Sequence, residues 1–138
     1  MNDIHEITVD AVLENIPAVT DWVNDLLEQA DCPMKAQLQL DVAIDELFSN
    51  IARYAYAPQT GKATLRLTLL QQPAGVALTF IDQGKPYDPL AKVDPDVTLS
   101  AEERAIGGLG IFLVKKTMDD MTYARQEDSN VLTITKLF

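Results

Sequence analysis

Hydrophobic residues in the first half of the chain recur first at strand spacing and then at helical spacing. Residues 4–9 end in β-branched apolar residues at alternate positions, which predicts a short strand. Residues 13–30 repeat apolar side chains three and four positions apart, which predicts a helix. Pro33 suits the first turn of a second helix, since its missing N–H has no intrahelical partner there, and we expect this helix to continue to about residue 56. Its expected buried stripe consists of Leu40, Ile44, Leu47, Ile51 and either Tyr54 or Ala55.

Strand-like alternation dominates the second half, beginning with leucines at every second position from Leu65 to Leu69. The expected elements are strands over 64–70 and 76–81, a helix over 111–118, and a closing hairpin of strands 121–125 and 131–137 around a turn at 127–130. Together with the first half, this order predicts one α+β domain over residues 1–138. We expect a two-layer sandwich in which a mixed, mainly antiparallel sheet carries helices on one face.

Residues 83–107 interrupt this regularity with three prolines and Asp-rich turns. Ser100 followed by Glu103 has the spacing of a capping box for a short helical turn. A loop of this length within a compact domain is usually functional or mobile. We therefore expect this segment either to take part in the function of the protein or to be mobile.

Composition narrows the class of protein. A chain of 138 residues with 47% hydrophobic residues can bury a substantial core, and its single cysteine excludes an internal disulfide and a cysteine-based zinc site. The absence of a signal-peptide pattern and of a membrane-spanning apolar run predicts a cytoplasmic protein. The net charge of −10 argues against nucleic-acid binding. The acidic surface either keeps the protein soluble or favours a basic protein partner.

The first candidate site lies on the second predicted helix, at Glu46, Asn50 and Arg53. Residues three or four positions apart share one helix face, so these three side chains form a line beside the apolar stripe. An amide oxygen is a suitable ligand for a Mg²⁺ ion that also carries nucleotide phosphates. A carboxylate one turn away can accept a proton from a hydroxyl group or a water. A solvated helix face would show the same spacing.

The second candidate site follows the strand over residues 76–81. Asp82 stands at the strand end, and Gly84 lets the backbone turn closely. A carboxylate in this position can accept a hydrogen bond from an exocyclic amine such as that of adenine. An ordinary Asp-x-Gly turn has the same pattern.

The third candidate site is the run Gly107, Gly108, Leu109 and Gly110 before the last predicted helix. Closely spaced glycines ahead of a helix expose backbone N–H groups to an anion such as phosphate. The run is neither a P-loop nor a dinucleotide-binding fingerprint, because no Gly-Lys-Ser/Thr follows and no strand leads directly into it. A flexible loop before a helix is the other interpretation.

Taken together, the three segments resemble the nucleotide-binding boxes of the GHKL ATPase/kinase superfamily. They are 45–56 (DELFSNIARYAY), 82–89 (DQGKPYDP) and 107–114 (GGLGIFLV). Within the superfamily, nearly the whole chain resembles the short anti-sigma-factor serine/threonine kinases. The resemblance implies the Bergerat fold, with ATP held between the helices and a flexible lid at about residues 85–106.

The resemblance also implies roles for individual side chains. In the first box, Asn50 would bind Mg²⁺, Glu46 would be the general base, Arg53 would contact phosphate and Tyr54 would lie near adenine. In the second, Asp82 would accept from the adenine amine, with Gly84 beside it. In the third, residues Gly107, Gly108, Leu109 and Gly110 would hold phosphate, and Arg104 would be the lid arginine that contacts the terminal phosphate.

The implied activity is transfer of the γ-phosphoryl group of Mg·ATP to a serine or threonine of an antagonist with a STAS domain. A second implied activity is sequestration of a sigma factor, and dimerisation is common in the group. The alternative is a regulatory module that binds ATP or ADP without phosphorylating its partner. Glu46 favours the kinase, because nucleotide binding alone has less need of a carboxylate there.

Overall fold

The computed structural model describes residues 3–91 and 109–138, without the side chain of Leu109. Five strands form one sheet in the order β1-β2-β3-β5-β4. The strands are β1 (Asp3–Asp10), β2 (Lys62–Gln71), β3 (Ala74–Asp82), β4 (Asp120–Gln126) and β5 (Ser129–Leu137). Each predicted strand is present and extends one or two residues beyond its expected bounds at one or both ends.

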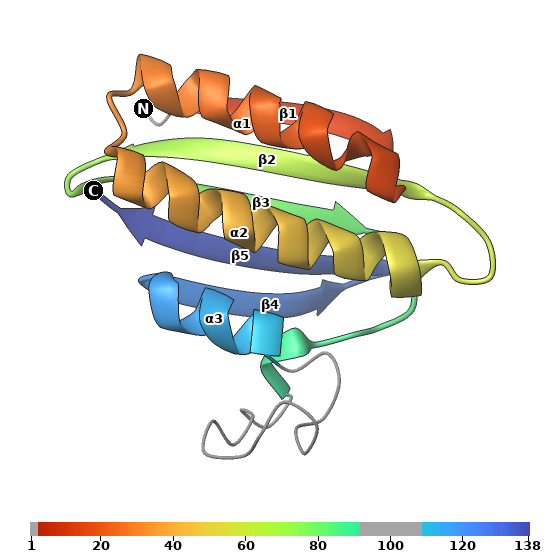
Figure 1. The fold of residues 1–138 in the computed structure, drawn as a ribbon. Helices are drawn as coiled ribbons and strands as arrows, with labels where there is room; N and C mark the ends of the chain where they lie inside the picture. The colour runs from red at the N-terminus through yellow and green to blue at the C-terminus, as the bar shows by residue number, and fades with distance from the viewer. Residues whose placement is uncertain (1–2, 92–108) are drawn as a thin grey trace.

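Three α-helices lie on one face of this sheet, which confirms the α+β class and the two-layer arrangement (Figure 1). They are α1 (Ile16–Gln29), α2 (Met34–Asn50) and α3 (Leu109–Thr117). Short 3₁₀ turns occur at Leu13–Asn15 and Pro89–Ala91. The expected helix over residues 13–30 therefore begins with a 3₁₀ turn, and α3 begins two residues before its predicted start.

All four strand pairs in the described residues are antiparallel, so the expectation of a mixed sheet is wrong in that detail. Two helices separate β1 from β2, and this even number returns the chain to the end of the sheet where β1 finished. Strands β3 and β4 run in the same direction (Figure 1), and α3 is the one α-helix among the described residues between them. They do not pair, because β5 lies between them and runs antiparallel to both.

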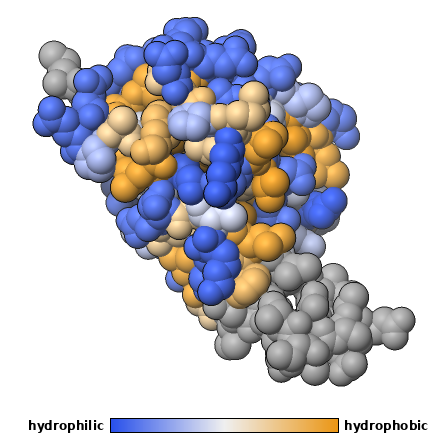
Figure 2. All heavy atoms as spheres, turned by 60° about the vertical axis from the view of Figure 1, so that its left-hand side comes forward, coloured by the Kyte–Doolittle hydropathy of each residue, from blue (hydrophilic) through white to orange (hydrophobic). Residues whose placement is uncertain are grey.

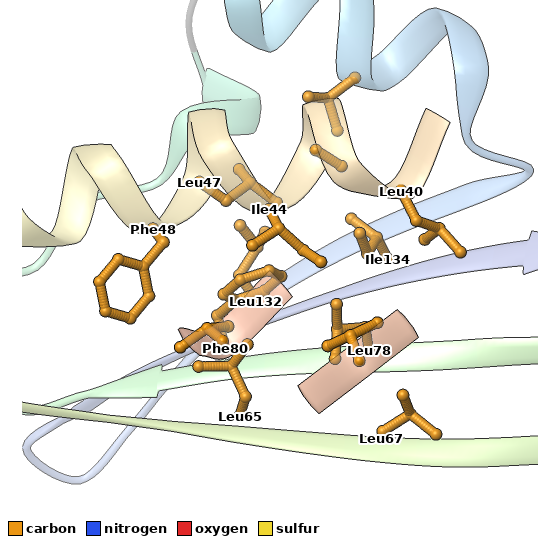
Figure 3. Packing of buried hydrophobic residues seen from close by; sticks show 14 of the residues in the cluster. Leu40, Ile44, Leu47, Phe48, Leu65, Leu67, Leu78, Phe80, Leu132 and Ile134 are labelled. Carbon is orange, nitrogen blue, oxygen red and sulfur yellow. The ribbon is translucent and has the colours of Figure 1, made fainter. Parts of the chain in front are cut away.

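The core lies between α2 and the inner face of the sheet (Figure 3). The predicted stripe Leu40, Ile44, Leu47 and Ile51 is buried, and Ala55 completes it, whereas Tyr54 is 59% exposed. Opposite the helix, the strands contribute every second side chain, as the alternation in β2 predicts. These side chains are Leu65, Leu67, Leu78, Phe80, Leu132 and Ile134.

Polar side chains pair on the sheet face that carries no helix. Across β1 and β2, Lys62 Nζ lies 2.6 Å from Asp10 Oδ1, and the hydroxyls of Thr8 and Thr64 are 2.8 Å apart. Thr79 and Thr133 form a similar pair between β3 and β5, with their hydroxyl oxygens 2.9 Å apart. In β2 the alternation is clear, because Lys62, Thr64 and Arg66 lie on this face whereas Ala63, Leu65 and Leu67 are buried.

The molecular surface combines hydrophilic and hydrophobic side chains (Figure 2). Within the described part of the chain, no helix is long and apolar enough to span a membrane. Cys32 is buried where α1 leads into α2, and this burial raises the pKa of its thiol. A buried thiol of this kind is a small core residue rather than a nucleophile.

Candidate functional site

A cavity of about 350 Å³ opens where the C-terminal end of α2 faces the ends of β3 and β5. Phe80 and Leu132 contribute buried apolar surface from the sheet, and Leu47 and Ile51 contribute apolar surface from the helix. Polar atoms are few and come from Asn50, Asp82 and Asn130, among other lining residues. An apolar cavity with a few fixed polar groups is the usual form of a small-molecule site.

Asp82 is the most buried ionisable residue of the cavity lining, with 4% of its surface exposed. Its Oδ1 atom accepts hydrogen bonds from the backbone N–H of Gly84 and from Asn130 Nδ2, both at 2.9 Å. Its Oδ2 atom accepts none from the residues that the structure describes. Because Asp82 lines the cavity, this oxygen is an acceptor that the cavity offers to a ligand N–H group.

Gly84 lies where the chain turns away from β3 and packs directly on Ala55. A Cβ atom at Gly84 would overlap the carbonyl oxygen of Ala55, so only glycine permits this approach. The next residue, Lys85, donates its backbone N–H to the same carbonyl at 2.9 Å. Arg125 Nη1 of β4 donates to the Gly84 carbonyl oxygen at 2.8 Å. The turn is therefore fixed from both the helix side and the sheet side.

Of the first candidate site, Glu46, Asn50 and Arg53, only Asn50 lines the cavity in the structure. Asn50 ends α2 and lines the cavity, and Tyr54 lines it as well. Glu46 lies one turn before Asn50, is half-buried, and does not line the cavity. Arg53, which the helical spacing places in line with Asn50, is exposed and also lies outside the lining.

A π-helix at Ile51–Ala55 accounts for the different placement of Arg53 and Tyr54. Its hydrogen bonds run from residue i to i+5, so each turn holds more residues than an α-helical turn. The face that carries Asn50 is therefore continued by a residue four positions on, Tyr54, rather than by one three positions on. The sequence pattern predicted an uninterrupted helix to about residue 56 and did not indicate this change.

Only part of the glycine run can be located. Gly107, Gly108 and Arg104 lie outside the described residues, as do Ser100, Glu103 and most of the expected lid at 85–106. Leu109 and Gly110 form the first residues of α3. Gly110 packs against Glu46, because a Cβ atom at position 110 would overlap the Glu46 carboxylate. The structure thus brings Glu46 of the first box and Gly110 of the third box together.

Asn130 is a site residue that the sequence pattern did not reveal. Residues 127–130 were expected to form a turn, but Asn130 belongs to β5 and pairs directly with Asp82 of β3. It is 6% exposed and lines the cavity. Its signal in the sequence is its position two residues before Leu132, on the inward face of the same strand. A buried amide at such a position is typical of a polar network rather than of a turn.

The residues at the cavity fit a nucleotide better than a metal ion held by protein side chains alone. The described residues contain no group of three or more histidine, cysteine, aspartate or glutamate side chains placed to bind one metal ion. A Mg²⁺ ion commonly takes one or two protein ligands and completes its shell with phosphates and water. Asn50, on the cavity lining, can supply one such ligand.

A model of one protein family, the histidine kinase-like ATPase domain, matches residues 9–136 of the chain. The chain is 29% identical over 114 residues to the serine/threonine-protein kinase BtrW of Bordetella bronchiseptica, covering 83% of this chain and 80% of that protein. It is 25% identical over 135 residues to the serine-protein kinase RsbW of Listeria monocytogenes, covering 89% and 85%. A serine-protein kinase RsbW of Bacillus cereus is 27% identical over 100 residues, covering 67% and 59%.

Proposed function

This chain belongs to the histidine kinase-like ATPase domain family, and from that premise we propose that it is an ATP-dependent protein serine/threonine kinase. In this proposal the protein acts as an anti-sigma regulatory factor. It phosphorylates a STAS-type antagonist and sequesters a sigma factor. The observation that carries the nucleotide assignment is the buried Asp82 carboxylate, whose Oδ2 atom has no donor among the described residues. The names of the similar proteins support the kinase assignment at the level of the family.

Adenine suits the cavity in shape and in hydrogen bonding. Phe80, Ile51 and Leu132 provide apolar surface for the flat base, and Asp82 Oδ2 accepts from its exocyclic amine. Tyr54 is an exposed residue of the cavity lining and would cover the base from the side of the π-helix. An apolar wall with one fixed acceptor favours a base that offers an amine at this point over one that offers a carbonyl oxygen.

The triphosphate would extend from the cavity toward Asn50 and the start of α3. Asn50 Oδ1 would bind Mg²⁺, and backbone N–H groups of residues 107–110 would donate to phosphate oxygens, as the N-terminus of a helix favours. We assign Arg53 and Arg104 to contacts with the phosphates and residues 85–106 to a lid over the nucleotide. Such groups act mainly by positioning the phosphates and by offsetting their negative charge.

Glu46 is assigned as the general base of the transfer. Bound Mg·ATP supplies the γ-phosphoryl group and the charge neutralisation that its transfer needs. The Glu46 carboxylate would accept the proton of the attacking serine or threonine hydroxyl as its oxygen bonds to the γ-phosphorus and the bond to the β-phosphate oxygen breaks, releasing ADP. Glu46 packs against Gly110 near the start of α3, so its carboxylate would lie beside the proposed phosphate site, where a general base is needed.

The partners are proposed from the resemblance to anti-sigma kinases. They are a STAS-domain antagonist, which supplies the hydroxyl, and a sigma factor, with assembly as a homodimer in the cytoplasm. The net charge of −10 disfavours nucleic acid as the partner.

Incubation of the protein with Mg·ATP and candidate STAS-domain proteins tests this function. Intact-mass spectrometry should show the antagonist gaining the mass of one phosphoryl group at a serine or threonine, with ADP formed in equal amount. A kinase without its Mg²⁺ should give no transfer, so a reaction with excess chelator is the control. ATP binding without transfer to any STAS-domain protein would contradict the kinase assignment and favour a regulatory module that binds nucleotide.

A further inference from the structure

Asn130 uses its whole hydrogen-bonding capacity at the edge of the cavity. Its Nδ2 atom donates to Asp82 Oδ1 at 2.9 Å and to the Lys85 carbonyl oxygen at 2.8 Å. Its Oδ1 atom accepts from the Tyr87 backbone N–H at 3.2 Å and from the Tyr123 hydroxyl at 2.5 Å. An asparagine side chain has two N–H donors and two acceptor lone pairs, so each is occupied.

These four partners fix the orientation of the amide. Rotating it by half a turn would place its oxygen against the Asp82 carboxylate and the Lys85 carbonyl, where only acceptors lie. It would also place its NH₂ group against the Tyr87 N–H, where a donor lies. Two lone-pair oxygens in contact inside a buried site are strongly unfavourable. Nδ2 therefore faces Asp82.

This orientation decides which carboxylate oxygen of Asp82 remains for a ligand. With the Gly84 N–H and Asn130 Nδ2 both bound to Oδ1, the carboxylate cannot rotate without losing two hydrogen bonds. We propose that Asn130 is a positioning residue that holds Asp82 with Oδ2 toward the base and thereby sets selectivity for a 6-amino purine. This role rests on the proposed adenine site and adds to it a residue that does not itself need to contact the base.

The Asn130 amide also links the Asp82 carboxylate to the segment that follows Gly84. Lys85 and Tyr87, which it holds through backbone atoms, are both on the cavity lining. Asn130 therefore fixes Asp82 and the chain beyond Gly84 as one unit. A change at position 130 should alter how the base is distinguished, and not only how stable the fold is.

The test compares ATP with inosine triphosphate, which carries an oxo group where adenine carries the 6-amine. Binding of both nucleotides with Mg²⁺ would be measured by isothermal titration calorimetry for the wild type, Asn130→Asp and Asn130→Ala. Asn130→Asp preserves shape but replaces the donor that faces Asp82 by an acceptor. Thr133→Ala is the matched control, because it removes the side-chain pair between the same two strands on the sheet face away from the cavity.

We expect the wild type to prefer ATP over inosine triphosphate by roughly 10- to 100-fold, the range of one hydrogen bond to a charged group. Both Asn130 variants should lower that preference by about tenfold, while Thr133→Ala leaves it unchanged. Equal loss of affinity for both nucleotides in the Asn130 variants, with the preference intact, would overturn the positioning role. A wild type without any preference would instead overturn the adenine site itself, so the two failures can be told apart.

Discussion

Replacing Asp82 with asparagine should weaken ATP binding by roughly 10- to 100-fold, the contribution of one hydrogen bond to a charged group. The introduced amide must keep its oxygen toward the Gly84 N–H and Asn130 Nδ2, which donate to Oδ1 in the wild type. Its NH₂ group then takes the place of Oδ2 and meets the adenine amine, donor against donor. Calorimetric titration with ATP measures the loss.

Measuring the binding of inosine triphosphate to Asp82→Asn tests the contact with the base more sharply than ATP alone. The oxo group of inosine triphosphate can accept from the new NH₂ group, so Asp82→Asn should reverse the preference and favour inosine triphosphate over ATP. Asp128→Asn is the control, since it removes one exposed carboxylate from the turn between β4 and β5 without changing the cavity. If Asp82→Asn binds ATP as tightly as Asp128→Asn does, Asp82 does not contact the base.

Replacing Glu46 with glutamine should slow phosphoryl transfer by about 10²- to 10⁴-fold, the usual contribution of a general base. Glutamine preserves the size of the side chain and its packing against Gly110, but it cannot accept the proton of the attacking hydroxyl. Because Glu46 lies outside the cavity lining, ATP affinity should change by much less than the rate. Single-turnover transfer to a STAS-domain protein, with ATP binding measured separately, distinguishes the two quantities.

Asp45→Asn provides the matched control for Glu46. Asp45 is the preceding residue on α2, carries the same charge and is exposed outside the cavity. Its substitution should leave both transfer and ATP affinity near the wild-type values. Transfer at the wild-type rate in Glu46→Gln would remove the general-base role and leave Glu46 with its packing contact to Gly110.

The sequence predicted the elements whose patterns depend on one face being buried. The stripe from Leu40 to Ile51 and the alternation of Leu65 and Leu67 identify the core-facing sides because apolar burial dominates the energetics. Asp82 with Gly84 was predicted as a close turn after a strand, and the structure shows that turn packed on Ala55. These features follow from local spacing and steric requirements.

The features that the sequence did not predict depend on contacts between distant segments. The π-helix at Ile51–Ala55 lies where the Ala55 carbonyl accepts the N–H of Lys85, a partner from beyond two strands of the sheet. Asparagine is a common turn residue, and only the pairing of Asn130 with Asp82 in the sheet brings its side chain to the cavity. The roles of Gly107, Gly108 and Arg104 stay predictions, since these residues lie outside the described part of the chain.

The location of the nucleotide is tested most directly by a crystal structure of the protein with Mg²⁺ and a non-hydrolysable β,γ-imido analogue of ATP. The adenine should occupy the cavity between the π-helix and β3, with its amine about 2.7–3.2 Å from Asp82 Oδ2, the range of an N–H···O hydrogen bond. Asn50 should be a ligand of the Mg²⁺ ion. A base bound outside this cavity, or one whose amine makes no hydrogen bond with Asp82, would contradict the proposed site.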